Sequence, residues 1–222
     1  MKEMKSVSDK ILEIKEQIPS GVSLIVVTKQ QSADAVMEAY RAGQRDFGEN
    51  RAGDLLQKAP GLPADIRWHF IGHLQTNKVK SILPYVSLIH SIDSFRLLQE
   101  VDKESIRSGK RTDCLLQFHI AREQTKFGLN LREASELLES SSFREMRGVR
   151  ICGLMGMATF TDNPEIVSGE FNDLAALFKE LKNKYFRHEP SFCEISMGMT
   201  GDYPLAIACG STMIRLGTAI FG

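Results

Sequence analysis

The stretch VSLIVVTKQQSADAVMEAYRAG, residues 22–43, contains the pattern that the rest of the chain repeats. Its first part, Val22–Val27, is a short apolar run with several β-branched residues, which predicts a buried strand. Ser32 then stands where a helix N-cap is expected, and apolar residues recur at helical spacing as far as Gly43. A strand followed at once by a helix is the repeating unit of parallel α/β proteins.

The same alternation continues to the end of the chain. Further strands are predicted at Arg45–Phe47, Trp68–Ile71, Ser87–His90, Asp113–His119, Val149–Leu154, Phe192–Ile195 and Met213–Leu216. Further helices are predicted at Arg51–Lys58, Asn77–Leu83, Ser94–Ser108, Leu131–Ser140, Pro164–Tyr185 and Tyr203–Cys209, with an extra helix in front at Lys2–Ile18. Eight strands, each but the last followed by a helix, predict an α/β fold: a single parallel TIM-like (β/α)8 barrel. The alternative is an open doubly wound sheet.

Composition and charge are those of an ordinary globular protein. The 222 residues are 42% hydrophobic and 25% charged, and no linker or repeat divides them, so one domain over residues 1–222 is expected. Lys plus Arg and Asp plus Glu both number 28, so no basic surplus points to a nucleic acid or an anionic membrane as partner. The sequence shows no apolar segment typical of a secretory signal or of a membrane span. The four cysteines form no CxxC motif, which suggests buried free thiols in a reducing compartment. We therefore expect a cytoplasmic protein.

Residues that carry chemistry gather directly after the predicted strands. In a parallel barrel these positions meet at one rim, where active sites lie. They are Lys29, Gly48-Glu49-Asn50, Gly72-His73, Ser91 and Asp93, Met155-Gly156-Met157, Ser196–Gly201, and Gly217-Thr218. So complete a set predicts a binding site at this rim.

Lys29 ends the apolar run LIVVTK. A partly desolvated amine at the mouth of a strand favours the neutral form and hence a Schiff base with an aldehyde. The alternative is a lysine that simply leaves the core for solvent. Lys126 is the rival amine, but it follows the polar stretch AREQT and ranks below Lys29.

The C-terminal stretch GSTMIRLGTAIFG, residues 210–222, suggests an anion site. Glycine lets backbone N–H groups approach an anion, threonine adds a hydroxyl donor, and the last two loops of barrels often bind phosphate. Gly217 and Thr218 would form this cup together with Ser196; the alternative is a pair of tight turns. Arg215 lies within the apolar strand and needs an acceptor, either an aromatic ring nitrogen or an ion-pair partner such as Glu49 or Asp93.

Four further residues have two interpretations each. Asn50 suits a hydrogen bond to a ring substituent such as a phenolic oxygen, or the N-cap of the helix before Arg51. Met155 and Met157 suit the face of a flat ring, or plain core. For His69 a hydrogen-bonded core position is the better interpretation, and no metal site is predicted because no third ligand has suitable spacing.

Taken together, VVTK, FGEN, WHFIGHLQTNK, HSID and SMGMTGDYPLAIACGSTMIRLGTAIFG closely resemble the pyridoxal phosphate homeostasis protein family, from about Val22 to Gly222. These proteins are relatives of the N-terminal barrel domain of alanine racemase. The resemblance implies pyridoxal 5'-phosphate (PLP) as cofactor, held as a Schiff base on Lys29. It implies Asn50 near the ring and Arg215 at the pyridine nitrogen. It further implies that Met155 lines the pocket and that the phosphate is held by Ser196, Gly217 and Thr218.

The family is described as lacking clear turnover and as keeping vitamin B6 and amino-acid pools balanced, so a non-enzyme is expected. An arginine facing the pyridine nitrogen leaves that nitrogen unprotonated and the ring a poorer electron sink. We also expect no further β-domain after the last strand, and only Tyr203 near the rim as a base. The resemblance suggests a monomer, with PLP-dependent enzymes as clients. The alternatives are a racemase-like amino-acid enzyme and a cofactor-free aldolase that uses Lys29.

Overall fold

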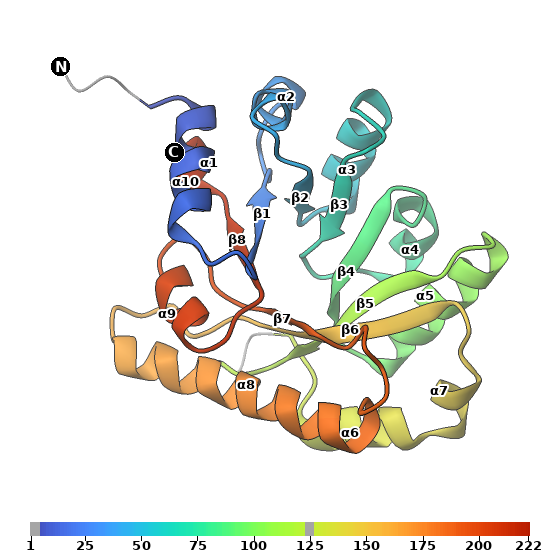
Figure 1. Ribbon diagram of the computed structural model, residues 1–222. Coiled ribbons are helices and arrows are strands. Elements are labelled where there is room, and N and C mark those ends of the chain that lie inside the picture. The colour runs from blue at the N-terminus through green and yellow to red at the C-terminus, as the bar shows by residue number, and fades with distance from the viewer. Residues whose placement is uncertain (1–4, 123–126) are drawn as a thin grey trace.

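Eight parallel strands close into a barrel in which each strand pairs with its neighbours in sequence order and β8 pairs with β1 (Figure 1). This computed structural model describes residues 5–122 and 127–222. The strands are β1 Ser23–Val27, β2 Asp46–Glu49, β3 Arg67–Phe70, β4 Val86–Ile92, β5 Thr112–Phe118, β6 Val149–Gly156, β7 Glu194–Ser196 and β8 Met213–Leu216. The predicted barrel is confirmed, and the open doubly wound sheet is wrong.

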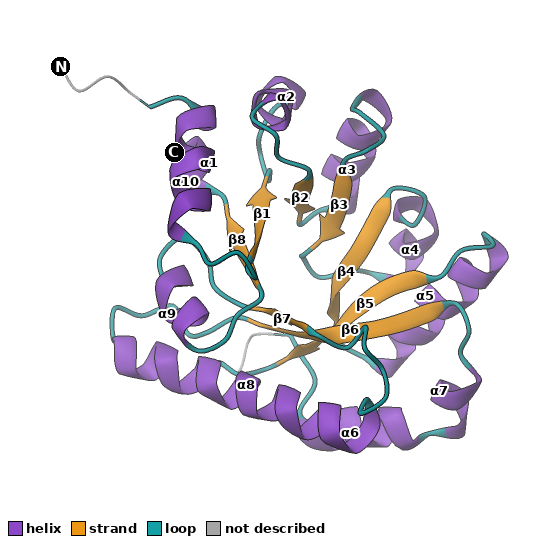
Figure 2. Cartoon of the chain, in the orientation of Figure 1, coloured by secondary structure: helices purple, strands orange, loops and turns teal. Residues whose placement is uncertain are grey.

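Helices surround the strands on the outside (Figure 2). They are α1 Val7–Gln17, α2 Ala33–Arg41, α3 Ala52–Lys58, α4 Thr76–Ile82, α5 Phe95–Arg107, α6 Leu131–Glu139, α7 Ser141–Glu145, α8 Pro164–Tyr185, α9 Tyr203–Ala208 and α10 Thr218–Phe221, with a 3-10 turn η1 at Ala59–Gly61. The first and last helices, α1 and α10, lie side by side, and Lys10 Nζ donates to the carbonyl oxygen of Gly222 at 2.6 Å.

The sequence pattern identifies most elements, and the differences have local causes. Ser32 caps α2 by accepting from the backbone N–H of Ala35 at 3.2 Å, as expected. The prediction that no helix follows the last strand is wrong, since α10 follows β8; this helix has only four residues, too few to show a period. The extra helix in front is confirmed as α1, which begins at Val7 after the cap Ser6; residues 2–4 of the predicted helix lie outside the described residues.

Two separate apolar clusters fill the two faces of the strands. Alternate residues of a strand point to opposite faces, so Leu24 and Val26 of β1 pack under the helices while Ile25 faces the barrel interior. The interior cluster consists of Ile25, Leu88, Leu115, Cys152, Met155 and Met213. Above and below these side chains the interior is polar, which leaves room for chemistry inside the barrel.

Gly153 allows β6 and β7 to approach closely. Its φ is 153°, and a Cβ atom placed there would lie 1.8 Å from the carbonyl oxygen of Glu194 on β7. Beside it, the pairing of β5 with β6 shifts register between Cys114 and Leu115. A side chain at Gly153 would therefore push two paired strands apart, which only a backbone shift can relieve.

The helices and the cysteines test the expectations of no membrane span and of buried thiols. Within residues 5–122 and 127–222, no helix combines the length and apolarity that crossing a bilayer requires. The four cysteines are free thiols, but only Cys114 and Cys152 are buried; Cys193 is exposed and Cys209 is half-buried, so the expectation of four buried thiols is wrong.

Replacing Gly153 with alanine should lower the free energy of unfolding by about 3 kcal/mol, because the added methyl group collides with the β7 backbone. The matched control is Gly169→Ala on the exposed face of α8, where nothing lies within 4 Å of the new methyl group. That control should be more stable by about 1 kcal/mol, because alanine favours a helix over glycine. Urea unfolding of both variants measures the difference; equal stability of the two would contradict this account of β6.

Candidate functional site

A cavity of about 610 Å³ opens at the rim where the strands end. Its walls come from the loops after β1, β2, β3, β5, β6, β7 and β8, together with strand side chains such as Gln117 of β5 and Arg215 of β8. The residues that line it include Lys29, Asn50, Gly72, His73, Gln117, Phe127, Met157, Phe160, Met199, Thr200, Asp202, Arg215, Gly217 and Thr218. About half of the residues predicted at this rim line the cavity. Those that do not are Gly48, Glu49, Ser91, Asp93, Met155, Gly156 and residues 196–198.

Lys29 stands on a tight turn directly after β1. The carbonyl oxygen of Thr28 accepts from the N–H of Gln31 at 3.0 Å, and Gln30 takes a φ of 62°, a left-handed conformation that glycine or asparagine usually supplies. The turn is held from below, because Thr28 Oγ1 donates to Glu49 Oε1 at 2.6 Å. This backbone presents an exposed amine at the cavity wall. The rival Lys126 lies outside the described residues.

Arg215 is a buried cation that reaches the floor of the cavity. Its Nη1 donates to Ser196 Oγ at 2.5 Å, and its Nη2 donates to the carbonyl oxygen of Gly156 at 3.1 Å. Burial lowers the pKa of Arg215 to about 10, and Asp202 opposes this shift. At neutral pH the guanidinium therefore remains charged.

The ion-pair alternative for Arg215 is wrong. Glu49 points outward from β2 and pairs with Lys58 Nζ at 2.6 Å. Asp93 pairs with His73 Nδ1 at 2.9 Å. Among the described carboxylates, none lies within ion-pair distance of Arg215. Its two hydrogen-bond acceptors are neutral, which leaves further N–H donors for a molecule in the cavity.

Asn50 presents an unsatisfied amide to the cavity. Its Oδ1 is buried and has no hydrogen-bond partner in the part of the chain that the structure describes. The N-cap of α3 is Arg51, so the capping alternative for Asn50 is wrong. A Cβ atom on Gly72 would lie 2.2 Å from the carbonyl oxygen of Asn50, so glycine is required for the close approach of these two loops. A buried polar atom without a partner is rare and points to a ligand contact.

The loops after β7 and β8 meet where an anion cup was expected. The N–H of Arg215 donates to the carbonyl oxygen of Gly198 at 3.0 Å, and the N–H of Ala219 donates to Thr200 Oγ1 at 3.4 Å. Gly217 and Thr218 line the cavity at this place, and so does Thr200. Hydroxyl groups and backbone N–H groups from two loops are the donors that bind a phosphate.

Ser196 and Met155 are buried and are not among the residues that line this cavity. Ser196 ends β7 with its hydroxyl buried against Arg215, and four further residues bring the chain up to Thr200 at the cavity. Met155 is fully buried in the interior cluster, whereas Met157, directly after β6, packs against this cluster and reaches the cavity.

Two histidines, His69 and His90, are buried in the interior, and the sequence pattern gave no role to His90. The predicted hydrogen-bonded core position of His69 is confirmed: its Nδ1 lies 2.9 Å from His90 Nε2. His90 in turn lies 2.9 Å from Ser196 Oγ through Nδ1. Burial lowers the pKa of His90 well below its ordinary 6.5, and the neighbouring His69 and Arg215 lower it further. The alternation of inward and outward positions along β3 and β4 could have placed each histidine in the interior, but not the contact between them, which depends on the pairing register of the two strands.

Comparison with known proteins identifies the family. The model of the alanine racemase N-terminal domain matches residues 3–222. The pyridoxal phosphate homeostasis protein of Synechocystis is 36% identical over 215 residues, covering 95% of both chains. The chain belongs to the pyridoxal phosphate homeostasis protein family. The family member of Escherichia coli K12 is 33% identical over 208 residues, covering 92% of this chain and 86% of that protein. The resemblance stated from the motifs is confirmed.

Solved structures agree with this family. PipY of Synechococcus elongatus PCC7942, a structure with PLP bound, is 32% identical with a TM-score of 0.87, and the match covers 98% of this chain and 100% of that one. Alanine racemase of Bartonella henselae, with covalently bound pyridoxal phosphate, is 16% identical with a TM-score of 0.72. At that identity the racemase shares the fold alone, and the match covers 58% of its length.

His90 should make the stability of the protein depend on pH. In the unfolded chain it takes up a proton as the pH falls below about 6.5, whereas in the folded chain it stays neutral. Unfolding then binds a proton, so the free energy of unfolding falls on acidification, by up to about 1.4 kcal/mol per pH unit for one proton.

Chemical unfolding at a series of pH values between about 7 and 5 measures this slope. The variant His90→Gln should show a shallower slope than the wild type, even if it is less stable throughout. The control His188→Gln replaces an exposed histidine and should keep the wild-type slope. If His90→Gln retains the full slope, His90 is not the cause of the pH dependence.

Proposed function

We propose that this protein, as one barrel domain over residues 1–222, binds PLP at the mouth of the barrel through Lys29 and acts in PLP homeostasis without catalytic turnover. The observation that carries the proposal is the convergence of an amine, a guanidinium and a phosphate-type donor set on one cavity. The name of the homeostasis relatives and the PLP-bound PipY structure support the same cofactor.

The residues of the cavity fit the parts of PLP. Lys29 supplies an amine for the aldehyde, Arg215 supplies N–H donors toward the pyridine nitrogen, and the unsatisfied amide of Asn50 suits the phenolic oxygen. Gly217 and Thr218 suit the phosphate, and Thr200 takes the place in this cup that Ser196 was expected to fill. Ser196 contributes indirectly, by holding Arg215.

Lys29 would hold the cofactor as a Schiff base. The amine nitrogen attacks the aldehyde carbon, a C=N bond forms and one water molecule leaves. The bond is reversible, since water can return to it. PLP bound in this way supplies an electrophilic ring with an anionic tail, and an open cavity allows the cofactor to enter and leave.

Two features of the chain favour a non-catalytic role over a racemase-like one. The pKa of Arg215, although lowered to about 10, keeps it protonated at neutral pH, so it donates to the pyridine nitrogen and leaves that nitrogen without a proton. The ring is then a poor electron sink for carbanion chemistry. Tyr203, the one candidate tyrosine base near the rim, directs its hydroxyl at Gln17 Oε1 of α1, 3.4 Å away.

The proposed setting is the cytoplasm, with PLP-dependent enzymes as recipients of the cofactor and with the protein acting as a monomer. A reversible bond at a wide mouth suits transfer between proteins. Of the large apolar side chains that are exposed, Phe127, Phe160 and Met199 stand at this mouth.

The wild-type protein with PLP bound as a Schiff base should be yellow, and borohydride should fix the cofactor on the Lys29 peptide. Lys29→Ala should lose both signals, because no amine remains at the cavity wall to form the C=N bond. The control Lys80→Ala removes an exposed lysine of α4 and should leave both signals intact. Absorption spectra and peptide mass spectrometry after borohydride reduction provide the readout. A Lys29→Ala protein that still fixes PLP would rule out Lys29, and a wild type that is trapped only by a sugar phosphate or keto acid would favour the aldolase alternative.

Thr200→Val should weaken PLP binding about tenfold, the effect of one hydrogen bond to a charged group. Binding of pyridoxal, which has the same ring and aldehyde but no phosphate, should not change. Titration of the ligand-free protein with both compounds measures the two affinities. A parallel loss for pyridoxal would show that Thr200 holds the ring or the fold and not the phosphate.

A further inference from the structure

A chain of polar side chains crosses the barrel interior from the mouth to the opposite end. Starting from Arg215, Ser196 Oγ lies 2.5 Å from Nη1 and 2.9 Å from His90 Nδ1. His90 Nε2 lies 2.9 Å from His69 Nδ1, and His69 Nε2 lies 3.1 Å from Asp46 Oδ1. The five residues come from β8, β7, β4, β3 and β2, which are far apart in sequence. Only the closed barrel brings them into one line.

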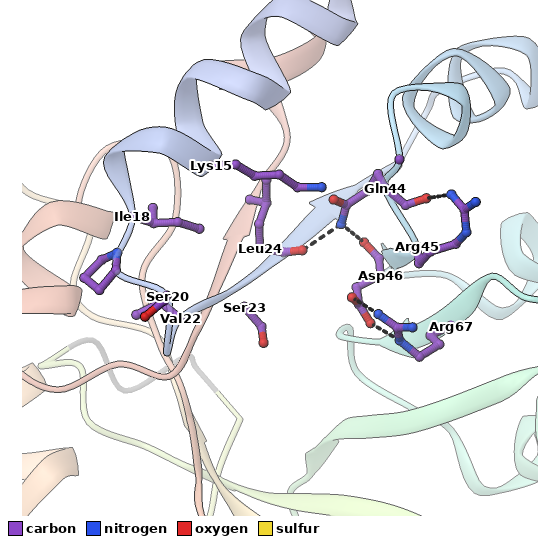
Figure 3. Close-up of a pocket in the computed structure, with 12 residues that line it drawn as sticks. Lys15, Ile18, Ser20, Val22, Ser23, Leu24, Gln44, Arg45, Asp46 and Arg67 are labelled. Atoms are coloured by element: carbon purple, nitrogen blue, oxygen red, sulfur yellow. Dashed lines mark hydrogen bonds and ion pairs between the residues drawn. The ribbon is translucent and has the colours of Figure 1, made fainter.

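The far end of this chain lies at a second cavity, of about 330 Å³, at the amino ends of the strands (Figure 3). Asp46 pairs there with Arg67, with Oδ2 and Nη2 2.5 Å apart. Gln44 Nε2 donates to the backbone carbonyl oxygens of Leu24 and Asp46, which holds the loop before β2 in place. The side chain of Asp46 is 21% exposed, so this end of the chain borders solvent whereas the middle is sealed.

The two ends determine the direction of every hydrogen bond between them. Arginine can only donate, and an ionised carboxylate can only accept. Hydrogen bonds from His69 and Arg67 outweigh the effect of burial and lower the pKa of Asp46 to about 2, so Asp46 is ionised near neutral pH. Ser196 accepts from Arg215 and donates to His90 Nδ1. His90 and His69 then carry their protons on Nε2, and His69 donates to Asp46. In this arrangement each hydrogen bond has one donor and one acceptor.

When each ring carries one proton, Asp46 disfavours the opposite direction. If His90 donated from Nδ1 to Ser196, His69 would donate from Nδ1 to His90 and its bare Nε2 would face the carboxylate of Asp46 at 3.1 Å. Two acceptors would then face each other without a proton between them, which is costly in a buried site.

We propose that Asp46, His69, His90 and Ser196 form a one-directional hydrogen-bond relay that holds the Arg215 guanidinium in place, with its remaining N–H donors toward the mouth. The four are positioning residues for Arg215. The relay depends on the chain alone, whereas its effect on a bound pyridine ring rests on the proposed function. A polar core with only a structural role would need every hydrogen bond to be satisfied. It would not need all the donors to point the same way, from Ser196 toward Asp46.

The direct test is the tautomeric state of the two imidazoles in ligand-free protein. Long-range nitrogen–proton NMR correlation spectra distinguish a proton on Nδ1 from one on Nε2, and the variants His69→Gln and His90→Gln assign the signals. Near neutral pH we expect a proton on Nε2 and none on Nδ1 of each ring. A proton on Nδ1 of either ring overturns the relay.

The second test breaks the relay at the end that borders solvent. Asp46→Ala removes the acceptor that sets the direction, so His90, which does not touch Asp46, should change to a mixture of tautomers. The matched control is Asp65→Ala, which removes a carboxylate that pairs with Arg45 but contacts neither histidine. An unchanged His90 in the Asp46→Ala protein contradicts the proposal.

The third test measures the effect on the cofactor. Ser196→Ala deprives Arg215 of its closest acceptor and should weaken PLP binding about tenfold and move the absorption maximum of the bound cofactor. The control Ser105→Ala removes another buried hydroxyl, which bonds to Thr112 Oγ1 at 2.7 Å and does not line the cavity, and should leave both quantities unchanged. Equal effects of the two variants contradict the proposal. If the wild type binds no PLP, the proposed function fails while the NMR tests still decide the relay.

Discussion

A guanidinium sealed inside a barrel has to be stabilised by the barrel itself, and much of the interior of this protein follows from that constraint. Arg215 is buried and is not paired with any described carboxylate, so its charge is met by a serine hydroxyl and a backbone carbonyl oxygen. The serine is in turn supported by two histidines and an aspartate. The polar interior is therefore arranged around one cation that faces the mouth.

The closed parallel barrel makes this arrangement possible. Because all strands run the same way, their carboxyl ends meet at one rim, and short loops from seven of them deliver side chains to the same cavity. The opposite rim receives Asp46 and Arg67 by the same geometry. A barrel interior is thus a path between two cavities, and its inward-facing positions decide whether that path is apolar or polar.

The strand–helix alternation and the motifs after the strands were readable from the sequence, because both are local. The bounds of β8 and α8 agree with the pattern to the residue. The distance of a side chain from the cavity along the barrel axis could not be predicted in the same way. Ser196 and Met155 were placed at the cavity, but the loops after β7 and β6 put Thr200 and Met157 there. The contact of His69 with His90 depends on the pairing register of β3 with β4, which shifts beside His69 and which no local pattern encodes.

The tryptophan of β3 has a practical consequence. Trp68 is the single tryptophan of the chain, is 3% exposed and packs against Phe47 with ring centroids 5.9 Å apart. It points outward from the strand that carries His69 inward, so its indole emission reports on the barrel wall at one known place. Fluorescence of the unmodified protein is therefore a site-specific optical probe, and no engineered label is required.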